Sequence, residues 1–305
     1  MGEKNLVELR GVARHYGAVH AVDGVDLDIG AGELFGLIGH NGAGKSTLFK
    51  MMLGLVPLTA GSIRVDGIDV TGPGFRDVRR RVGYQPENVV LYDNLTGLET
   101  LQFFAKLKGA AADDCGALLE KVGLSHAAGR RVRGYSRGMR QRLGFAQALL
   151  GSPRLVFLDE PTSGLDPEAV RAFYATLREL RDAGVTVVLT SHILAEIQDR
   201  VDRLAILVAG KVRALGTVQA LREQVALPLE LRVRVRAGSA EAVAAAVRAP
   251  GIEVALVSGG DALSVRCPRA EKMRVLDVLA TRRDDVHDID VREPSLEDLF
   301  FGFSD

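Results

Sequence analysis

The run Gly39-His40-Asn41-Gly42-Ala43-Gly44-Lys45-Ser46 constrains the fold of this chain more than any other segment. It fits the phosphate-binding pattern G-x-x-x-x-G-K-S/T completely. Glycines in such a loop let backbone N–H groups converge on phosphate oxygens, and a helix that follows presents its positive end to the same anion. The Lys45 ammonium suits the β- and γ-phosphates, the Ser46 hydroxyl suits Mg²⁺, and Thr47 is expected to contact the nucleotide beside them.

The surroundings of this loop are those that the pattern requires. Residues 34–39 predict a short buried strand, and residues 45–53 predict a helix. A strand, a glycine-rich turn and a helix in this order indicate a nucleoside triphosphate site within an α/β domain.

An acidic pair follows a second buried strand, which residues 155–158 predict. Asp159 and Glu160 stand at the carboxyl end of that strand, where α/β sheets bind ligands. Asp159 suits a Mg²⁺ contact through water, and Glu160 suits a base that orients and deprotonates an attacking water. An Asp-Glu pair alone is common, but beside a phosphate loop it predicts hydrolysis of the nucleotide.

The chain divides into two parts. Up to about residue 220, strands alternate with helices, which predicts a mostly parallel sheet covered by helices. Alternating residues 5–10 and 25–29 predict antiparallel strands at one edge, and residues 97–150 predict a helical subdomain. We therefore expect a first domain over 1–220 and a second over 221–305.

The second domain is expected to be small and of the α+β class. Its pattern reads strand, helix, strand, strand, helix, strand from residue 229 onward, which is the ferredoxin-like order. One face of its first strand carries Glu230, Arg232 and Arg234, which favours a solvated face. Residues 294–300 predict a further capped helix at the end of the chain.

Composition excludes some classes of function. Lys and Arg together number 39, as do Asp and Glu, so no net charge draws the chain to nucleic acid. No apolar run reaches the roughly 20 residues that a membrane-spanning helix needs. Cys115 and Cys267 lie far apart and have no Cys or His partner at metal-ligand spacing, so both are expected to be free thiols.

The segment Tyr135-Ser136-Arg137-Gly138-Met139-Arg140-Gln141 resembles the Leu-Ser-Gly-Gly-Gln signature of ABC ATPases. It departs from that signature at Leu→Tyr, Gly→Arg and Gln→Met, while Ser136 and Gly138 remain. Ser136 and the backbone around Gly138 suit a γ-phosphate contact. The Met at 139 leaves open how the contact normally made by the signature glutamine is replaced.

Further elements of the same family follow in its order. By this resemblance, Tyr16 is the aromatic residue that stacks on adenine, and Gln85 is the glutamine that senses Mg²⁺. Asp166 ends a segment similar to the D-loop between two subunits, and His192 is similar to the switch histidine at the γ-phosphate.

The resemblance covers residues 5 to about 220 and implies a fold and partners. The fold is an α/β P-loop NTPase of ABC type, with a mixed sheet core, an antiparallel edge sheet and a helical subdomain, plus the ferredoxin-like C-terminal domain. The expected cofactors are ATP and Mg²⁺. The expected assembly is a homodimer held to the cytoplasmic face of the inner membrane by a separate ABC-2-type permease.

A narrower resemblance concerns the transported cargo. Four stretches are similar to the ATPase of the copper-processing transporter that matures nitrous oxide reductase, which implies a periplasmic accessory protein as a further partner. The alternative is the ATPase of an ABC-2-type exporter of a drug, lipid or polysaccharide. A soluble ABC ATPase of translation or DNA repair is a third class, which the single cassette and the absence of a heptad run disfavour. The four stretches are 39–42, 83–110, 135–151 and 294–299.

Overall fold

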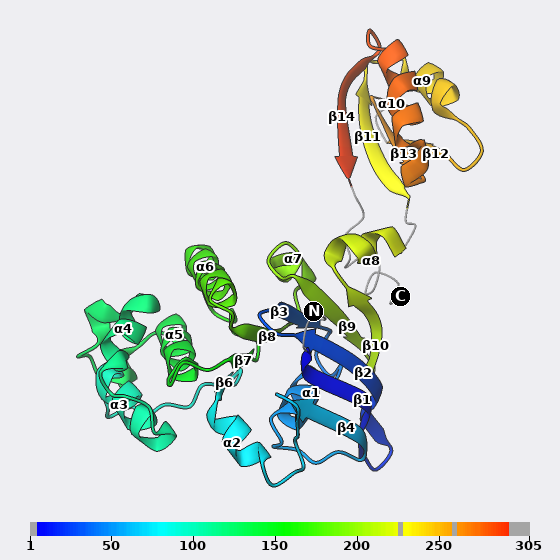
Figure 1. Cartoon of the computed structure of the whole chain (residues 1–305). Helices are drawn as coiled ribbons and strands as arrows, with labels where there is room; N and C mark the ends of the chain where they lie inside the picture. Colours follow the sequence, from blue (N-terminus) through cyan, green and yellow to red (C-terminus); the bar gives the residue numbers. More distant parts are fainter. Residues whose placement is uncertain (1–4, 225–227, 258–260, 293–305) are drawn as a thin grey trace. The chain divides into compact units, whose positions relative to one another are not determined.

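A computed structural model describes residues 5–224, 228–257 and 261–292 of the chain (Figure 1). The chain forms two compact units, Met1–Val218 and Gln219–Asp305. The helix expected over residues 294–300 lies outside the described residues. Among the described helices, none is both long and apolar enough to span a bilayer.

A six-stranded mixed sheet forms the centre of the first unit, as predicted. Its strand order is β10-β9-β3-β8-β7-β6, and every neighbouring pair is parallel except β9 and β10. Strands β3, β7 and β8 are buried along their whole length, which explains why their sequences are apolar runs without alternation. The strands are β3 (Leu34–Ile38), β6 (Val82–Gln85), β7 (Leu155–Leu158), β8 (Thr186–Ser191), β9 (Arg203–Val208) and β10 (Lys211–Gly216).

A four-stranded antiparallel sheet of order β2-β1-β4-β5 lies beside it. Its first two strands are much longer than the expected 5–10 and 25–29. The prediction depended on strict alternation of apolar and polar residues along each strand. Shifts in the pairing register near Gly11, which has φ +56°, break that alternation, although the strands continue. The strands are β1 (Asn5–Tyr16), β2 (Val19–Gly30), β4 (Ala60–Val65) and β5 (Ile68–Asp69).

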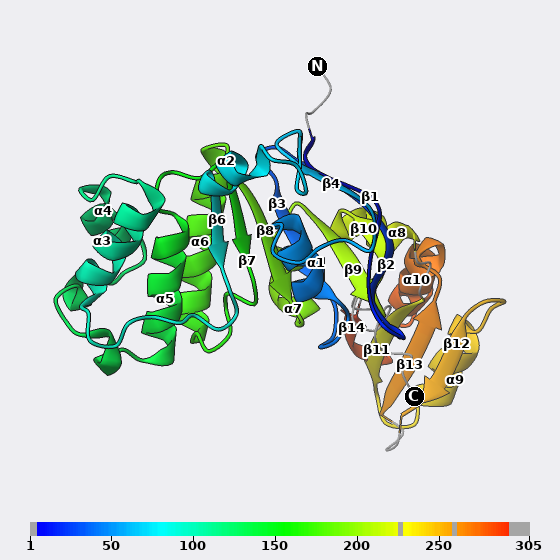
Figure 2. The ribbon, with the colours of Figure 1, turned by 90° about the horizontal axis from the view of Figure 1, so that it is seen from below.

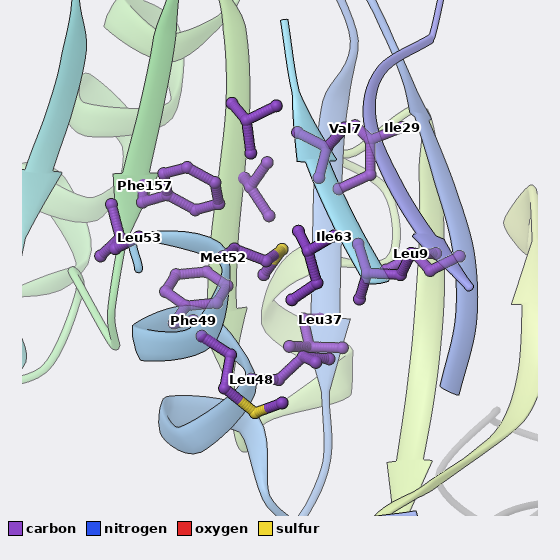
Figure 3. Close-up of a cluster of buried hydrophobic side chains, with 14 of the residues drawn as sticks. Val7, Leu9, Ile29, Leu37, Leu48, Phe49, Met52, Leu53, Ile63 and Phe157 are labelled. Carbon is purple, nitrogen blue, oxygen red and sulfur yellow. The ribbon is translucent and has the colours of Figure 1, made fainter. Parts of the chain in front are cut away.

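Helix α1 (Lys45–Met52) fills the space between the two sheets (Figure 3). Its Phe49 and Met52 point into a cluster with Phe157 of the central sheet and Val7 and Ile29 of the antiparallel sheet. The rings of Phe49 and Phe157 meet edge to face, with centroids 5.3 Å apart. This core holds the helix, and with it the loop before the helix, against both sheets.

The helical subdomain lies beyond strand β6, on the side away from the antiparallel sheet (Figures 1 and 2). Its helix α3 begins with a complete capping box, in which Thr96 and Glu99 exchange side-chain and backbone hydrogen bonds. Helix α6 follows β7 and leads back to β8. The remaining helices of the first unit are α2 (Phe75–Arg80), α3 (Gly97–Lys108), α4 (Asp114–Lys121), α5 (Arg137–Ala148), α6 (Pro167–Asp182) and α7 (Leu194–Ile197). Helix α8 (Val218–Gln224) begins at the last residue of that unit.

The second unit has the ferredoxin-like order that the sequence predicts. Its sheet runs β12-β13-β11-β14 with every pair antiparallel, and its core is formed by the inward residues of β11 and β13 with helices α9 and α10. On the other face, Arg232 lies opposite Asp290, and Arg234 forms an ion pair with Asp288. The elements are β11 (Leu229–Val235), α9 (Ala240–Val247), β12 (Glu253–Leu256), β13 (Ala262–Cys267), α10 (Lys272–Thr281) and β14 (Val286–Arg292).

Candidate active site

The phosphate loop connects β3 to α1 and depends on two glycines that approach other backbone closely. A Cβ at Gly39 would overlap the carbonyl oxygen of Leu207, and a Cβ at Gly44 would overlap that of Ala21. Gly44 also has φ +104° and caps α1 without a side-chain hydrogen bond. The first amides of α1 have no partner within the helix, so they are available to an anion in the loop.

Lys45 is a buried cation held within the loop. Its side chain is 6% exposed, and Nζ lies 2.5 Å from the carbonyl oxygen of Gly39 and 3.3 Å from that of His40. The carboxylate Oε1 of Glu160 is 3.4 Å away. The backbone of the loop thus aims the ammonium group, and Glu160 balances its charge.

The carboxylate of Asp159 is fixed by two hydroxyl groups. Thr190 Oγ1 donates to Asp159 Oδ1 at 2.7 Å, and Ser46 Oγ donates to the same oxygen at 3.3 Å. Asp159 is 3% exposed. Burial, together with the nearby Asp159 charge, raises the pKa of Tyr84 to about 12, so the Tyr84 hydroxyl stays protonated at neutral pH.

Glu160 and His192 form a close pair. Glu160 Oε2 lies 2.8 Å from His192 Nδ1, while Glu160 Oε1 faces Lys45. The backbone of Glu160 has φ +47°, a left-handed conformation that costs a non-glycine residue about 1–2 kcal/mol. Its N–H donates to Thr190 Oγ1 at 2.8 Å, which helps to hold this conformation. Such strain persists where the surroundings determine the geometry of a functional group.

These groups open into one cavity of about 420 Å³. Nine residues predicted for the site line it, and so do six residues that the sequence reasoning missed. The predicted residues are His40, Asn41, Gly42, Gly44, Lys45, Ser46, Thr47, Glu160 and His192. The missed residues are Val19, His20, Ala21, Glu87, Ser163 and Ala209.

Other predicted site residues lie outside this cavity lining. Tyr16 is 47% exposed at the end of β1, where the guanidinium of Arg14 lies 4.3 Å from the centre of its ring. Gly39 and Ala43 belong to the loop and are buried. The side chain of Gln85 is fully buried, and its Nε2 donates to Gln141 Oε1 at 2.6 Å.

Ser136 and Gly138 of the signature segment do not line the cavity of their own chain. Ser136 caps α5 by accepting from the amide of Met139 at 3.2 Å, and Gly138 lies in the first turn of that helix. Arg137 donates to Ser163 Oγ at 2.7 Å. Asp166 in turn caps α6 by accepting from the amide of Ala169.

Comparison with known proteins identifies the family. Residues 22–163 match the family model described as ABC transporter. The daunorubicin/doxorubicin resistance ATP-binding protein DrrA of Streptomyces peucetius is 35% identical over 98% of this chain and 92% of its own length. This chain belongs to the ATP-binding subunits of ABC transporters. Family members hydrolyse ATP, associate as dimers and serve transmembrane permeases.

Two further relatives extend the comparison. The linearmycin resistance ATP-binding protein LnrL of Bacillus subtilis is 31% identical over 98% of both chains. The human phospholipid-transporting ATPase ABCA3 is 39% identical over 73% of this chain, which corresponds to 13% of that longer protein.

Solved structures agree with the fold. An ATP-binding subunit of an ABC transporter superposes with a TM-score of 0.66 at 34% identity, covering 72% of this chain and 92% of the other. A dimeric cassette in a post-hydrolysis state bound to ADP and Pi gives a TM-score of 0.64 at 26% identity, covering 70% of this chain and 98% of the other.

The residues of the cassette fit the Mg²⁺ that accompanies ATP in this family. Ser46 and Asp159 offer hard oxygen donors 3.3 Å apart in a buried setting, which is the ligand type that Mg²⁺ prefers. A Mg²⁺ ion held by these residues would supply positive charge that neutralises the phosphate oxygens of ATP. The protein itself places the Lys45 ammonium and the Glu160 carboxylate 3.4 Å apart in the same cavity. His192 fixes Glu160 from the other side.

Proposed function

We propose that this cassette powers the export of a drug or lipid, as a homodimer beneath an ABC-2-type permease at the cytoplasmic face of the membrane. One observation carries the proposal. The similarity to DrrA and to LnrL, two proteins named for drug resistance, runs over 98% of the chain and therefore includes the second unit. The alternative that the sequence left open is thus the better supported one.

The copper-processing interpretation receives no support from these relatives. They are named for resistance to daunorubicin, doxorubicin and linearmycin, and for phospholipid transport. A periplasmic accessory partner was expected only from that interpretation, and no other observation supports it.

An exposed apolar surface supports a permease partner. Val90 is 85% exposed, Tyr92 is 52% exposed and Leu107 is 68% exposed, and exposed apolar side chains that cluster mark interaction sites. Tyr92 contacts Phe103 edge to face, with centroids 5.3 Å apart, so the segment after β6 joins the surface of α3. We assign this surface, defined by Val90, Tyr92, Phe103 and Leu107, to the permease.

The position of the signature segment supports the homodimer. Ser136 and Gly138 lie outside the cavity that holds Lys45 and Glu160, so one copy lacks a γ-phosphate contact that a second copy supplies. A symmetric pair would complete both sites.

The dimer is tested with Glu160→Gln, which keeps the shape of the site but removes the base. We expect size-exclusion chromatography to show an ATP-dependent dimer of this variant. The double variant Lys45→Ala/Glu160→Gln is the control and should stay monomeric with ATP. A monomeric Glu160→Gln protein at saturating ATP would contradict the dimer.

The transport assignment is tested separately in cells. Deletion of the gene should increase sensitivity to anthracycline-type drugs or alter exported lipids, and only the hydrolytically competent chain should restore the phenotype. Val90→Glu/Leu107→Glu should abolish co-purification with the membrane subunit and should fail to restore resistance. The same pair of changes should leave the ATP-dependent dimer of Glu160→Gln intact. Co-purification with ribosomes or DNA instead of a membrane subunit would favour the non-transport class.

A further inference from the structure

His15, His20 and Asp23 bring three metal-binding side chains together at one end of the antiparallel sheet. Their ligand atoms all lie within 4.8 Å of one another, and no other such group occurs among the residues that the structure describes. His15 and His20 are direct partners across β1 and β2. Their rings stack with centroids 3.9 Å apart and planes 11° apart.

The polar atoms of this group are incompletely satisfied. His15 Nε2 is buried without a hydrogen-bond partner and lies 3.7 Å from Asp23 Oδ1. The backbone of Asp23 is fixed, because its N–H donates to the carbonyl oxygen of Gly210 at 2.9 Å. A buried nitrogen that faces a carboxylate and makes no hydrogen bond is costly unless a ligand occupies the space between them.

Asp23 can accept a cation on one oxygen while the other oxygen keeps its present partner. Its Oδ2 pairs with Lys211 Nζ at 3.1 Å, and Oδ1 faces His15. The hydrogen bond from Lys211 lowers the pKa of Asp23, so the carboxylate is charged at neutral pH. Lys211 is 53% exposed, so solvent and salt screen its charge from a cation that binds at Oδ1.

We propose that His15, His20 and Asp23 bind a divalent first-row transition-metal ion of the Zn²⁺ type. Two imidazoles and a carboxylate suit such an ion, and three protein ligands leave a fourth position for water. Metal–ligand bonds of about 2.1 Å in a tetrahedron place ligand atoms about 3.4 Å apart, which is close to the 3.7 Å between His15 Nε2 and Asp23 Oδ1. One imidazole must turn about its Cβ–Cγ bond, because each lone pair lies in the plane of its ring.

Bound metal would clamp the two strands beside the nucleotide cavity. His20 lines that cavity together with Val19 and Ala21, and Tyr16 directly follows His15. The ion would join β1 to β2 at this point and restrict the hairpin that carries these residues. The metal site itself does not depend on the transport assignment.

The test is a calorimetric titration of the full chain with ZnCl₂ alone, without nucleotide. We expect one Zn²⁺ per chain, and an affinity at least about 10-fold weaker in each of His15→Ala, His20→Ala and Asp23→Asn. His126→Ala removes another exposed histidine and should bind Zn²⁺ like the unmodified chain. Without Zn²⁺, each variant should have the same midpoint of thermal unfolding as the unmodified chain, which would show that the variants are folded.

Amide hydrogen exchange provides a second readout. Zn²⁺ should slow exchange over residues 15–23 in the unmodified chain and in His126→Ala, but not in His20→Ala. The proposal would be overturned if no Zn²⁺ binds. It would also be overturned if an adventitious ion only is found, that is, if binding is non-stoichiometric and is the same in the three ligand variants as in the unmodified chain.

Discussion

The side-chain amide of Gln85 donates to Gln141 Oε1 at 2.6 Å, and both residues are buried. Gln141 also donates from Nε2 to the carbonyl oxygen of Glu87 at 3.0 Å. The segment that leaves β6 is thereby attached to α5, the helix that Ser136 caps. A movement of α5 would therefore be transmitted to the end of β6, next to Asp159.

Replacement of Gln141 by Ala should weaken the attachment between these two elements. The buried amide of Gln85 would lose its 2.6 Å hydrogen bond and keep only the 3.2 Å one to the backbone carbonyl of residue 141, and this loss costs about 1–3 kcal/mol of unfolding free energy. We expect this loss in urea unfolding, together with reduced ATP hydrolysis at nearly unchanged nucleotide affinity. Arg140→Gln is the matched control on the same helix. It breaks only a partly exposed ion pair with Asp93, and its cost should stay below about 1 kcal/mol.

Replacement of Gly44 by Ala should abolish nucleotide binding. A Cβ there would overlap the carbonyl oxygen of Ala21, and φ is +104°, so the loop must move. Gly42→Ala is the control, because φ is +83° but no atom lies within 4 Å of its Cβ. We expect that variant to lose about 1–2 kcal/mol of stability through backbone strain and to keep measurable ATP binding. Equal nucleotide affinity in both variants would contradict the close approach at Gly44.

Replacement of Phe49 by Ala should destabilise the first unit strongly. Phe49 is fully buried between the two sheets, and loss of an aromatic ring from such a core costs about 3–5 kcal/mol. Leu55 follows the same helix but is 53% exposed, so Leu55→Ala should change stability by no more than about 0.5 kcal/mol. Chemical denaturation of the two variants provides the comparison.

The capping box of α3 should make stability depend on pH. Hydrogen bonding with Thr96 lowers the pKa of Glu99 in the folded chain, so the charged form stabilises the fold above the unfolded pKa of about 4.3. That contribution is lost as pH falls through the folded pKa. We expect the unmodified chain to exceed Glu99→Gln in stability at pH 7, and the difference to narrow at pH 4. A difference that stays constant or widens on acidification would contradict this role.

Much of the fold could be predicted because its signals are local. The buried strand at residues 155–158 and the strand–loop–helix at the phosphate loop show their structure within a few residues. The ferredoxin-like order of the second unit was also visible, because cross-strand charges such as Arg232 opposite Asp290 leave a regular alternation in each strand.

The remaining features depend on contacts between distant segments. The pairing of His15 with His20 was missed because register shifts ended the expected strand at residue 10 and hid the hairpin. Because the hairpin was not predicted, the start of β2, where Val19, His20 and Ala21 line the cavity, was not assigned to the site either. The hydrogen bond of Gln85 reaches a residue 56 positions away, which no local pattern indicates, and its contact with Mg²⁺ stays a prediction.

Thr190 is the feature with the widest consequence. Its single hydroxyl donates to the Asp159 carboxylate and accepts the N–H of Glu160, so two neighbouring acidic residues share one anchor on β8. Valine has nearly the same shape and would fill the same space, yet it would leave the Glu160 N–H without this acceptor and Asp159 Oδ1 with only the longer hydrogen bond from Ser46. Position 190 is therefore selected by hydrogen-bonding chemistry rather than by size, although the sequence around it reads as an ordinary hydrophobic strand.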